Sequence, residues 1–185
     1  MRSGPLNFGN VVLYARNNFN QTPVSGDGSV PYYDFSQIPG NWDCTNFVSH
    51  ALLAGGANVH DTGGSGISST GWYFRNLSNR SSSWSSVNYL HSFLTTNTTP
   101  NTLGGSSSDY TTRPGYWNTG YVIQFNNPTV GTWCHSLIIT GKSYYEDRQY
   151  ALCTGRASPY SYQDNKNAAE IYPGGAKRTI YVYNN

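Results

Sequence analysis

The sequence predicts an α+β fold, with N-terminal helices packed on a C-terminal antiparallel sheet in a single domain over residues 1–185. Apolar residues recur at spacings of three and four in the first half of the chain, which is typical of amphipathic helices. After Gly120 the pattern changes to short runs rich in β-branched and aromatic residues, which is typical of strands. The length of 185 residues fits one domain with a sizeable core.

Three segments have the helical pattern, and we expect helices at residues 6–19, 44–54 and 84–95. The central helix has the clearest boundaries. Asp43 precedes it as the expected N-cap, because its carboxylate can accept from free N–H groups at the helix start. Gly55 and Gly56 follow it, and either can supply the left-handed residue that ends a helix.

The segments between the helices are rich in glycine, proline, serine and asparagine, which are typical loop residues. We expect loops at residues 20–40, 55–83 and 96–119. Long loops inside a domain are usually functional or mobile. Strands are expected at residues 121–125, 133–140, 150–154 and 178–183, with a turn at residues 142–149 joining the second strand to the third.

The charge of the chain is low, with 11% charged residues and a formal net charge of +2. A nucleic-acid-binding protein is expected to carry a basic stripe, so we expect no nucleic-acid partner. No run of about 18 apolar residues occurs, and no membrane span is therefore expected. The sequence has neither zinc-ligand spacing nor a phosphate-binding glycine loop, so we expect no metal and no cofactor.

Residues 1–5 do not lead into the apolar core of a signal peptide. We interpret the chain as a mature form from which a signal has been removed, and we expect a secreted or cell-envelope protein. A surface rich in serine, threonine, asparagine and tyrosine suits contact with sugars or peptides. The pattern leaves the oligomeric state open.

Cys44 lies in the first turn of the expected central helix. Unpaired N–H groups and the helix dipole stabilise a thiolate there, which favours a reactive cysteine. Free cysteine is also among the most buried residue types, so an inert core thiol is an equal alternative from position alone. A reactive thiol needs a base, which directs attention to the histidines.

The chain has four histidines, namely His50, His60, His91 and His135. The first lies six residues along the helix of Cys44 and therefore well off the Cys44 face. The second lies in an expected loop and the third in the third helix. His135 lies early in a hydrophobic strand, where a polar residue is out of keeping with simple core packing. It is either the base that holds the thiolate or a strand-end histidine bonded to a backbone carbonyl.

A thiolate at a helix start, paired with a histidine from a facing sheet, is the arrangement of papain-like cysteine hydrolases. Residues 43–49 and 51–56 have the sequences DCTNFVS and ALLAGG, which resemble the signature of the bacterial putative amidase domain family. That family is similar to the NlpC/P60 and CHAP groups of the papain-like superfamily. Further matches follow in order: VLYA (12–15), GWY (71–73), SWSSV (83–87), GYVIQF (120–125) and WCHSLIIT (133–140). The resemblance covers nearly the whole chain, and the cysteine segment is its most specific part.

The resemblance implies that Cys44 is the nucleophile and His135 the general base of a papain-like fold. Related enzymes carry a polar residue on the next strand that orients the histidine, and this family resembles a His-Thr pair there. The matching pair here is Cys153-Thr154, and a thiol is a weak partner for imidazole. The orienting group is therefore left open between Cys153, Thr154, a backbone carbonyl and a residue from elsewhere in the chain such as Asp147, or it is absent.

Cys134 and Cys153 lie in strands that we expect to pair across the 142–149 turn. If they lie opposite one another, with Cα atoms within about 7 Å, they can form a disulfide that leaves Cys44 free. We hypothesise this bridge, because three cysteines are too few for a disulfide scaffold but fit one working thiol and one bridge.

The implied reaction is amide hydrolysis through a thioester, with the oxyanion bound by the Cys44 backbone N–H and one further donor. Asn41, Trp42 and Tyr32 are candidates for that donor or for lining the cleft. Asp43 is either a structural cap or a catalytic group. Relatives with this core often cut cell-wall peptides, so a peptide or peptidoglycan-like substrate is expected. Deamidation, transamidation and lipid acyl transfer use the same core.

Two alternatives to a hydrolase are open. An inactive hydrolase fold can serve as a glycan- or peptide-binding module through its aromatic loops, and the altered residue Cys153 favours that interpretation. A toxin or effector with the same acyl-transfer core, acting on a host protein, is also compatible with the sequence.

Overall fold

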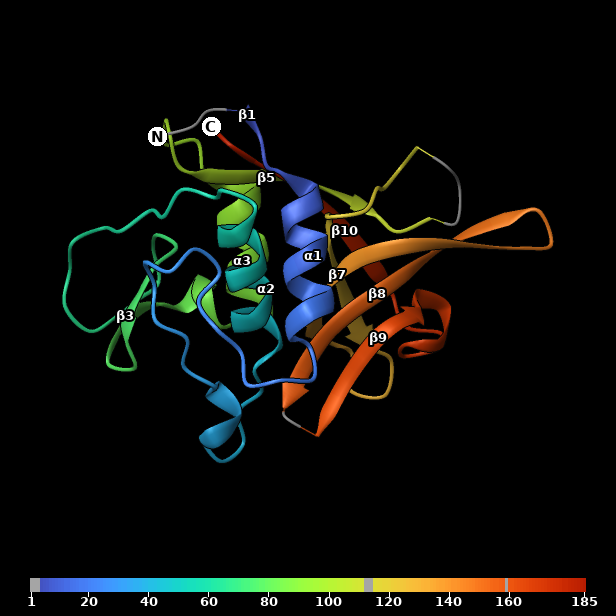
Figure 1. Ribbon diagram of the computed structural model, residues 1–185, viewed down its shortest axis with the longest axis horizontal. Coiled ribbons are helices and arrows are strands. Elements are labelled where there is room, and N and C mark those ends of the chain that lie inside the picture. Colours follow the sequence, from blue (N-terminus) through green and yellow to red (C-terminus); the bar gives the residue numbers. More distant parts are fainter. Residues whose placement is uncertain (1–3, 112–114, 159) are drawn as a thin grey trace.

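The computed structural model describes residues 4–111, 115–158 and 160–185, so residues 112–114 of the expected 96–119 loop lie outside the described residues. Within the described part, three α-helices lie together against one face of an antiparallel sheet (Figure 1). They are α1 (Phe8–Asn18), α2 (Cys44–Ala54) and α3 (Val87–Thr96). The predicted α+β class is confirmed. No helix in the described ranges is both long and apolar enough to cross a membrane.

The large sheet is built from strands β1 (Gly4–Pro5), β5 (Leu103–Asp109), β6 (Val122–Asn127), β7 (Thr132–Tyr145), β8 (Arg148–Ser158), β9 (Ser161–Asn167) and β10 (Lys177–Asn184). Their order is β1-β10-β6-β7-β8-β9, and β5 also pairs with β10. A small sheet has the order β2-β4-β3, from β2 (Ile67–Ser68), β3 (Phe74–Asn76) and β4 (Asn79–Ser81). Short 3-10 helices are η1 (Phe35–Gln37), η2 (Ser82–Trp84) and η3 (Ala168–Glu170).

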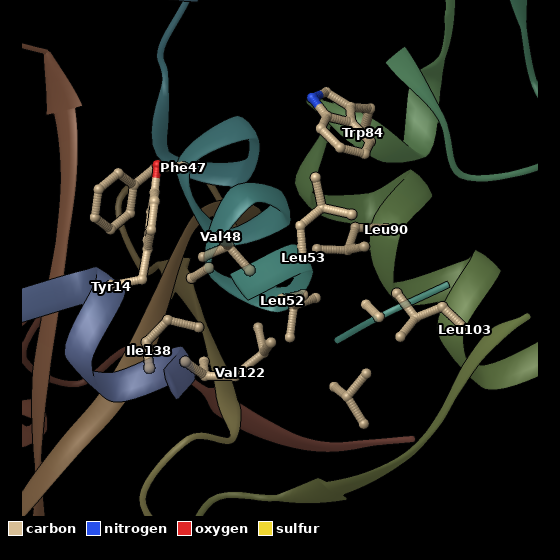
Figure 2. Close-up of a cluster of buried hydrophobic side chains, with 14 of the residues drawn as sticks. Tyr14, Phe47, Val48, Leu52, Leu53, Trp84, Leu90, Leu103, Val122 and Ile138 are labelled. Carbon is tan, nitrogen blue, oxygen red and sulfur yellow. The ribbon is translucent and has the colours of Figure 1, made fainter. Parts of the chain in front are cut away.

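Helix α2 is the centre of the packing, and its first ten residues, 44–53, are all buried. Its apolar side chains join one core cluster with side chains of α1, α3 and the sheet (Figure 2). Buried polar groups need partners inside the protein, and Ser49 of α2 accordingly donates to the Trp84 carbonyl at 2.9 Å. The helix that carries Cys44 is therefore held on every side.

The boundaries of α2 agree with the expected range 44–54, and its C-terminal end is as predicted. Gly56 has φ +89° and its N–H donates back into the last turn at 2.8 Å. Asp43 is the N-cap residue by position, as expected, but the expected capping hydrogen bond from its side chain is absent. Its buried carboxylate accepts instead from the Phe35 N–H, the Asn46 side-chain amide and the Tyr32 hydroxyl. The Asp43 carboxylate therefore links the preceding loop to a side chain in the first turn of α2, without capping the backbone N–H groups of the helix.

Three strands of the large sheet lie where no strand is expected, namely the two-residue β1 and the longer β5 and β9. Strand β5 falls inside the expected 96–119 loop, and β9 follows the expected strands without an apolar pattern. Their sequences, LGGSSSD and SYQDNKN, are rich in residues with low strand propensity. They become strands because β10 and β8 offer pairing partners along their lengths. Tertiary pairing thus overrides local propensity at both places.

Strands β7 and β8 run through most of the expected 142–149 turn and form a long hairpin that projects from the body of the molecule (Figure 1). The chain reverses at Glu146 and Asp147, which have φ +45° and +59°. Two successive positive φ angles are typical of the tight turns that join twisted strands. Asp147 therefore lies at the hairpin tip.

The three cysteines are free, so the hypothesised Cys134–Cys153 disulfide is wrong. The pairing of the two strands is confirmed, but its register places Ile139 opposite Cys153. Cys134 lies five residues away along β7, which at about 3.3 Å per residue separates the two cysteines by roughly 17 Å. The register follows from the position of the hairpin turn, which the local pattern does not determine.

Candidate active site

Cys44 and His135 come from two elements that pack against each other. Cys44 begins α2, and His135 lies in the buried part of β7. Their sequence neighbours are linked, because Thr45 Oγ1 donates to Ser136 Oγ at 3.2 Å. The His135 ring is hydrogen-bonded to the Cys44 side chain, and the Ser136 backbone N–H donates to the same sulfur. The structure thus brings together the two residues that the sequence analysis paired.

The surroundings of this pair favour charge on both side chains. Burial alone raises the pKa of Cys44, but the charge and hydrogen bond of His135, the Ser136 N–H and the Thr45 hydroxyl outweigh it and lower that pKa below the usual thiol value. Burial alone lowers the pKa of His135, but the Cys44 charge and hydrogen bonds raise it above the usual value. A buried thiolate and an imidazolium therefore stabilise each other.

Gln163 of β9 is the orienting partner that the sequence analysis missed. Its Oε1 atom lies 3.1 Å from His135 Nε2, so the amide oxygen accepts from the Nε2–H group. This contact leaves Nδ1 as the ring atom that serves the thiol. Pairing of β9 with β8, in which Gln163 lies opposite Gly155, places the amide here. Because residues 161–167 have no strand pattern, the sequence offers little signal for it.

The three residues proposed for the orienting role lie elsewhere. Thr154 bonds to the Thr140 hydroxyl at 2.7 Å and accepts from the Asn165 N–H at 3.0 Å. Cys153 is fully buried in an apolar cluster, and burial raises its pKa. Asp147 lies in the turn at the hairpin tip. None of these three candidates contacts the His135 ring in the described contacts, and the partner is a residue from another strand, Gln163 of β9.

Two neighbouring pockets open at the Cys44–His135 pair, and together they form the candidate cleft. We call one half the histidine-side pocket, which is lined by His135, Gln163, Lys166, Glu170 and Tyr172. The other half, the cysteine-side pocket, is lined by Cys44, Thr45, Asn41, Arg80, Ser86 and Asn88. Trp42 and Cys134 line both pockets, which shows that the two halves meet there. A substrate can therefore extend in both directions from the reactive sulfur.

The candidates for the second oxyanion donor are divided by the structure. Asn41 and Trp42 line the cleft immediately before Cys44, and Trp42 is 62% exposed. Tyr32 lies elsewhere, because its hydroxyl donates to the buried Asp43 carboxylate behind the cysteine. The expectation that Tyr32 lines this cleft is wrong, since the hydrogen bond to Asp43 directs its side chain into the protein.

Asp43 belongs to a buried polar cluster behind the site. Burial raises the pKa of Asp43 to about 7, against the hydrogen bonds from Tyr32, Phe35 and Asn46 that lower it. The buried Arg156 guanidinium lies 3.6 Å from Asp43 and 2.9 Å from Asp34. The Asp43 N–H also donates to the Ala157 carbonyl of β8 at 2.9 Å. These contacts fix the segment before Cys44 to the sheet, which supports the structural interpretation of Asp43.

Tyr172 is a further residue of the cleft that the sequence analysis missed. Its ring packs edge-on at 6.5 Å from the His135 ring, and its backbone φ is +47°. A positive φ is uncommon for a large residue, so the surrounding structure must hold it in place. In the described part of the chain, no group of three or more His, Cys, Asp or Glu side chains is placed to hold a metal ion.

Comparison with known families places the chain in a family. The model of a family described as a putative amidase domain matches residues 6–183, which is nearly the whole chain. The description of that family indicates an amide hydrolase in general terms. No curated protein and no solved structure gives a significant match to this chain.

Proposed function

The chain belongs to the putative amidase domain family, and we propose that it hydrolyses amide bonds by nucleophilic attack of the Cys44 thiolate. The observation that carries this proposal is the hydrogen-bonded series from Cys44 through His135 to Gln163. A nucleophile at a helix start, a base in contact with it and a third group that orients the base are the parts that covalent acyl transfer needs. The parts come from three different elements: Cys44 and His135 from buried stretches of α2 and β7, and Gln163 from the partly exposed strand β9.

In the proposed reaction Cys44 Sγ forms a bond to the amide carbonyl carbon, and the carbonyl π electrons move onto oxygen. When the C–N bond breaks, the imidazolium of His135 donates its proton to the leaving nitrogen, which gives a thioester and a free amine. Neutral His135 then takes a proton from water, and the resulting hydroxide attacks the thioester. The C–S bond breaks, and the carboxylic acid and the Cys44 thiolate are released.

The oxyanion of both tetrahedral intermediates needs hydrogen-bond donors. We propose the Cys44 backbone N–H at the start of α2 as the first donor. The second is supplied by the segment of Asn41 and Trp42, which lines the same pocket as the sulfur. The dipole of α2 also points its positive end at this position.

We propose a peptide amide as the substrate, and cell-wall peptide as its natural source. The support is an open cleft on both sides of the sulfur, with the exposed indole of Trp42 and amide and hydroxyl side chains along it. Such a lining can stack on and hydrogen-bond an extended peptide. A secreted or cell-envelope location, where that substrate occurs, belongs to the same proposal.

The presence of Gln163 supports hydrolysis over the alternative of a binding module. The altered residue Cys153 favours that alternative in the sequence, because no orienting partner is visible on the expected strand. In the fold the partner comes from the next strand, β9.

The test combines hydrolysis with labelling of the thiol. Soluble cell-wall peptides and fluorogenic peptide amides are incubated with the protein, and new amines and carboxylates are identified by mass spectrometry. We expect Cys44→Ala to lower the rate by more than about a thousandfold. Cys153→Ala is the matched control and should keep the activity, because that thiol lies in a separate apolar cluster. Hydrolysis that persists in Cys44→Ala would contradict the proposal.

A further inference from the structure

The proposed chemistry assigns the two halves of the cleft to the two halves of a substrate, and this step rests on the proposed function. His135 must protonate the leaving nitrogen, so the amine part lies over the imidazole and enters the histidine-side pocket. The carbonyl carbon lies at the Cys44 sulfur, so the acyl part extends into the cysteine-side pocket. Charged side chains in the cysteine-side pocket therefore interact with the acyl part of the substrate.

Arg80 is the one cationic or carboxylate side chain among the described residues that line the cysteine-side pocket. It lies on β4, and its guanidinium carbon is 5.1 Å from the centre of the Phe35 ring at the pocket wall. One terminal nitrogen donates to the Leu77 carbonyl, while Nε has no hydrogen-bond partner in the described structure. A guanidinium has five N–H groups, so three remain besides these two, one on the bonded terminal nitrogen and two on the other, and they can donate to a ligand.

No carboxylate neutralises Arg80 within the described part of the chain. The contrast with Arg75, on the neighbouring strand β3, is informative, because Arg75 pairs with Asp61 at 2.7 Å. Partial burial lowers the pKa of Arg80, because it removes part of the hydration of the guanidinium. A second cation, Arg178, lies 4.0 Å from the centre of the Trp133 ring, and Trp133 lines the same pocket. The described lining of the pocket thus includes one cation that no carboxylate neutralises, and a second cation packs behind its Trp133 wall.

We propose that the cysteine-side pocket selects acyl groups that carry a free carboxylate, and that Arg80 binds that carboxylate. A planar guanidinium recognises a carboxylate through paired N–H donors, and Asn88, Ser86 and Asn41 offer further polar groups beside it. The substrate class is therefore a peptide amide whose carbonyl-donating residue is acidic.

The first experiment measures kcat/KM for coumarin amides of N-acetyl-glutamate, N-acetyl-glutamine and N-acetyl-lysine, which share one leaving amine. We expect the glutamate amide to be preferred, and Arg80→Gln to lower that preference about tenfold or more, as for loss of a hydrogen bond to a charged group. Arg80→Lys should restore part of it, and Arg75→Gln should leave it unchanged. Equal rates for the three amides, or the same preference in Arg80→Gln, would overturn the inference.

The second experiment does not need turnover. Iodoacetyl-β-alanine carries a carboxylate, and its β-alaninamide counterpart is neutral, so the ratio of their alkylation rates at Cys44 reports the potential of the pocket. We expect a ratio above that of free cysteine, which falls in Arg80→Gln and not in Arg75→Gln. A ratio that Arg80→Gln leaves unchanged would overturn the inference. If no amide is cleaved but the ratio behaves as expected, the hydrolase proposal fails while carboxylate selection stands.

Discussion

Cys44 and Cys153 are both buried, at 3% and 0% exposure, yet their surroundings shift their pKa values in opposite directions. Cys153 packs in an apolar cluster opposite Ile139 of β7, where burial disfavours its thiolate. Cys44 lies at a helix start and contacts the His135 ring and the Ser136 N–H. Burial is therefore not what makes a thiol reactive. The cation and the donors that accompany burial decide the charge of the sulfur.

Removing the His135 imidazolium should have the largest effect on the difference in pKa between Cys44 and Cys153. In His135→Ala the pKa of Cys44 should rise, because the interactions that outweigh burial are lost. In the wild type, the Cys44 thiolate should persist as the pH falls below the ordinary thiol pKa. In the variant, the thiolate should become protonated at a higher pH than in the wild type. We expect iodoacetamide to alkylate Cys44 about a hundredfold more slowly at pH 6, and the amide hydrolysis rate to fall by about 10²–10⁴. Alkylation rates from pH 5 to pH 10 measure this.

A wild-type and a His135→Ala profile that coincide would show that the histidine does not hold the thiolate. The stability of the folded variant, measured by thermal unfolding, controls for disruption of β7.

Loss of the orienting amide should have a smaller effect. Gln163→Ala should slow hydrolysis about tenfold, because one hydrogen bond to a charged ring is removed. That hydrogen bond raises the pKa of His135, so its loss should move the alkaline limb of the pH–rate profile to lower pH. Gln163→Glu keeps a hydrogen-bond acceptor at the same place, so the alkaline limb should not move to lower pH as it does in Gln163→Ala. A lower rate with an unmoved profile in Gln163→Ala would indicate a structural role only.

The smallest effect is expected at the inert thiol. Cys153→Ala should cost about 1 kcal/mol of unfolding free energy, since it removes one buried sulfur from a packed cluster. It should leave the alkylation rate of Cys44 unchanged. Urea unfolding and the same iodoacetamide assay check both expectations. A change in Cys44 reactivity would mean that the two thiols are coupled across the sheet.

The parts of the site that could be predicted are those with a local pattern. The apolar spacing and the glycine pair define α2, and this places Cys44 at its start. His135 is a polar residue in a hydrophobic strand, which made it the best partner. Gln163 could not be predicted, because residues 161–167 become a strand only by pairing with β8. The proposed role of Arg80 could not be predicted either, because it depends on the absence of a neighbouring carboxylate in the described structure.

The helix that carries Cys44 and the class of the fold follow from the sequence alone, because periodicity and residue type are properties of short segments. The pairing of Cys44 with His135 is implied by the family resemblance, since the residue patterns alone leave an inert role open for both side chains. Only the tertiary structure decided what orients His135, why Asp43 holds a loop, and that Cys134 and Cys153 lie too far apart to bridge. These features depend on strand register and on contacts between segments far apart in the chain. Where the local preference for strand or loop is weak, the strands available for pairing in the rest of the fold decide the conformation.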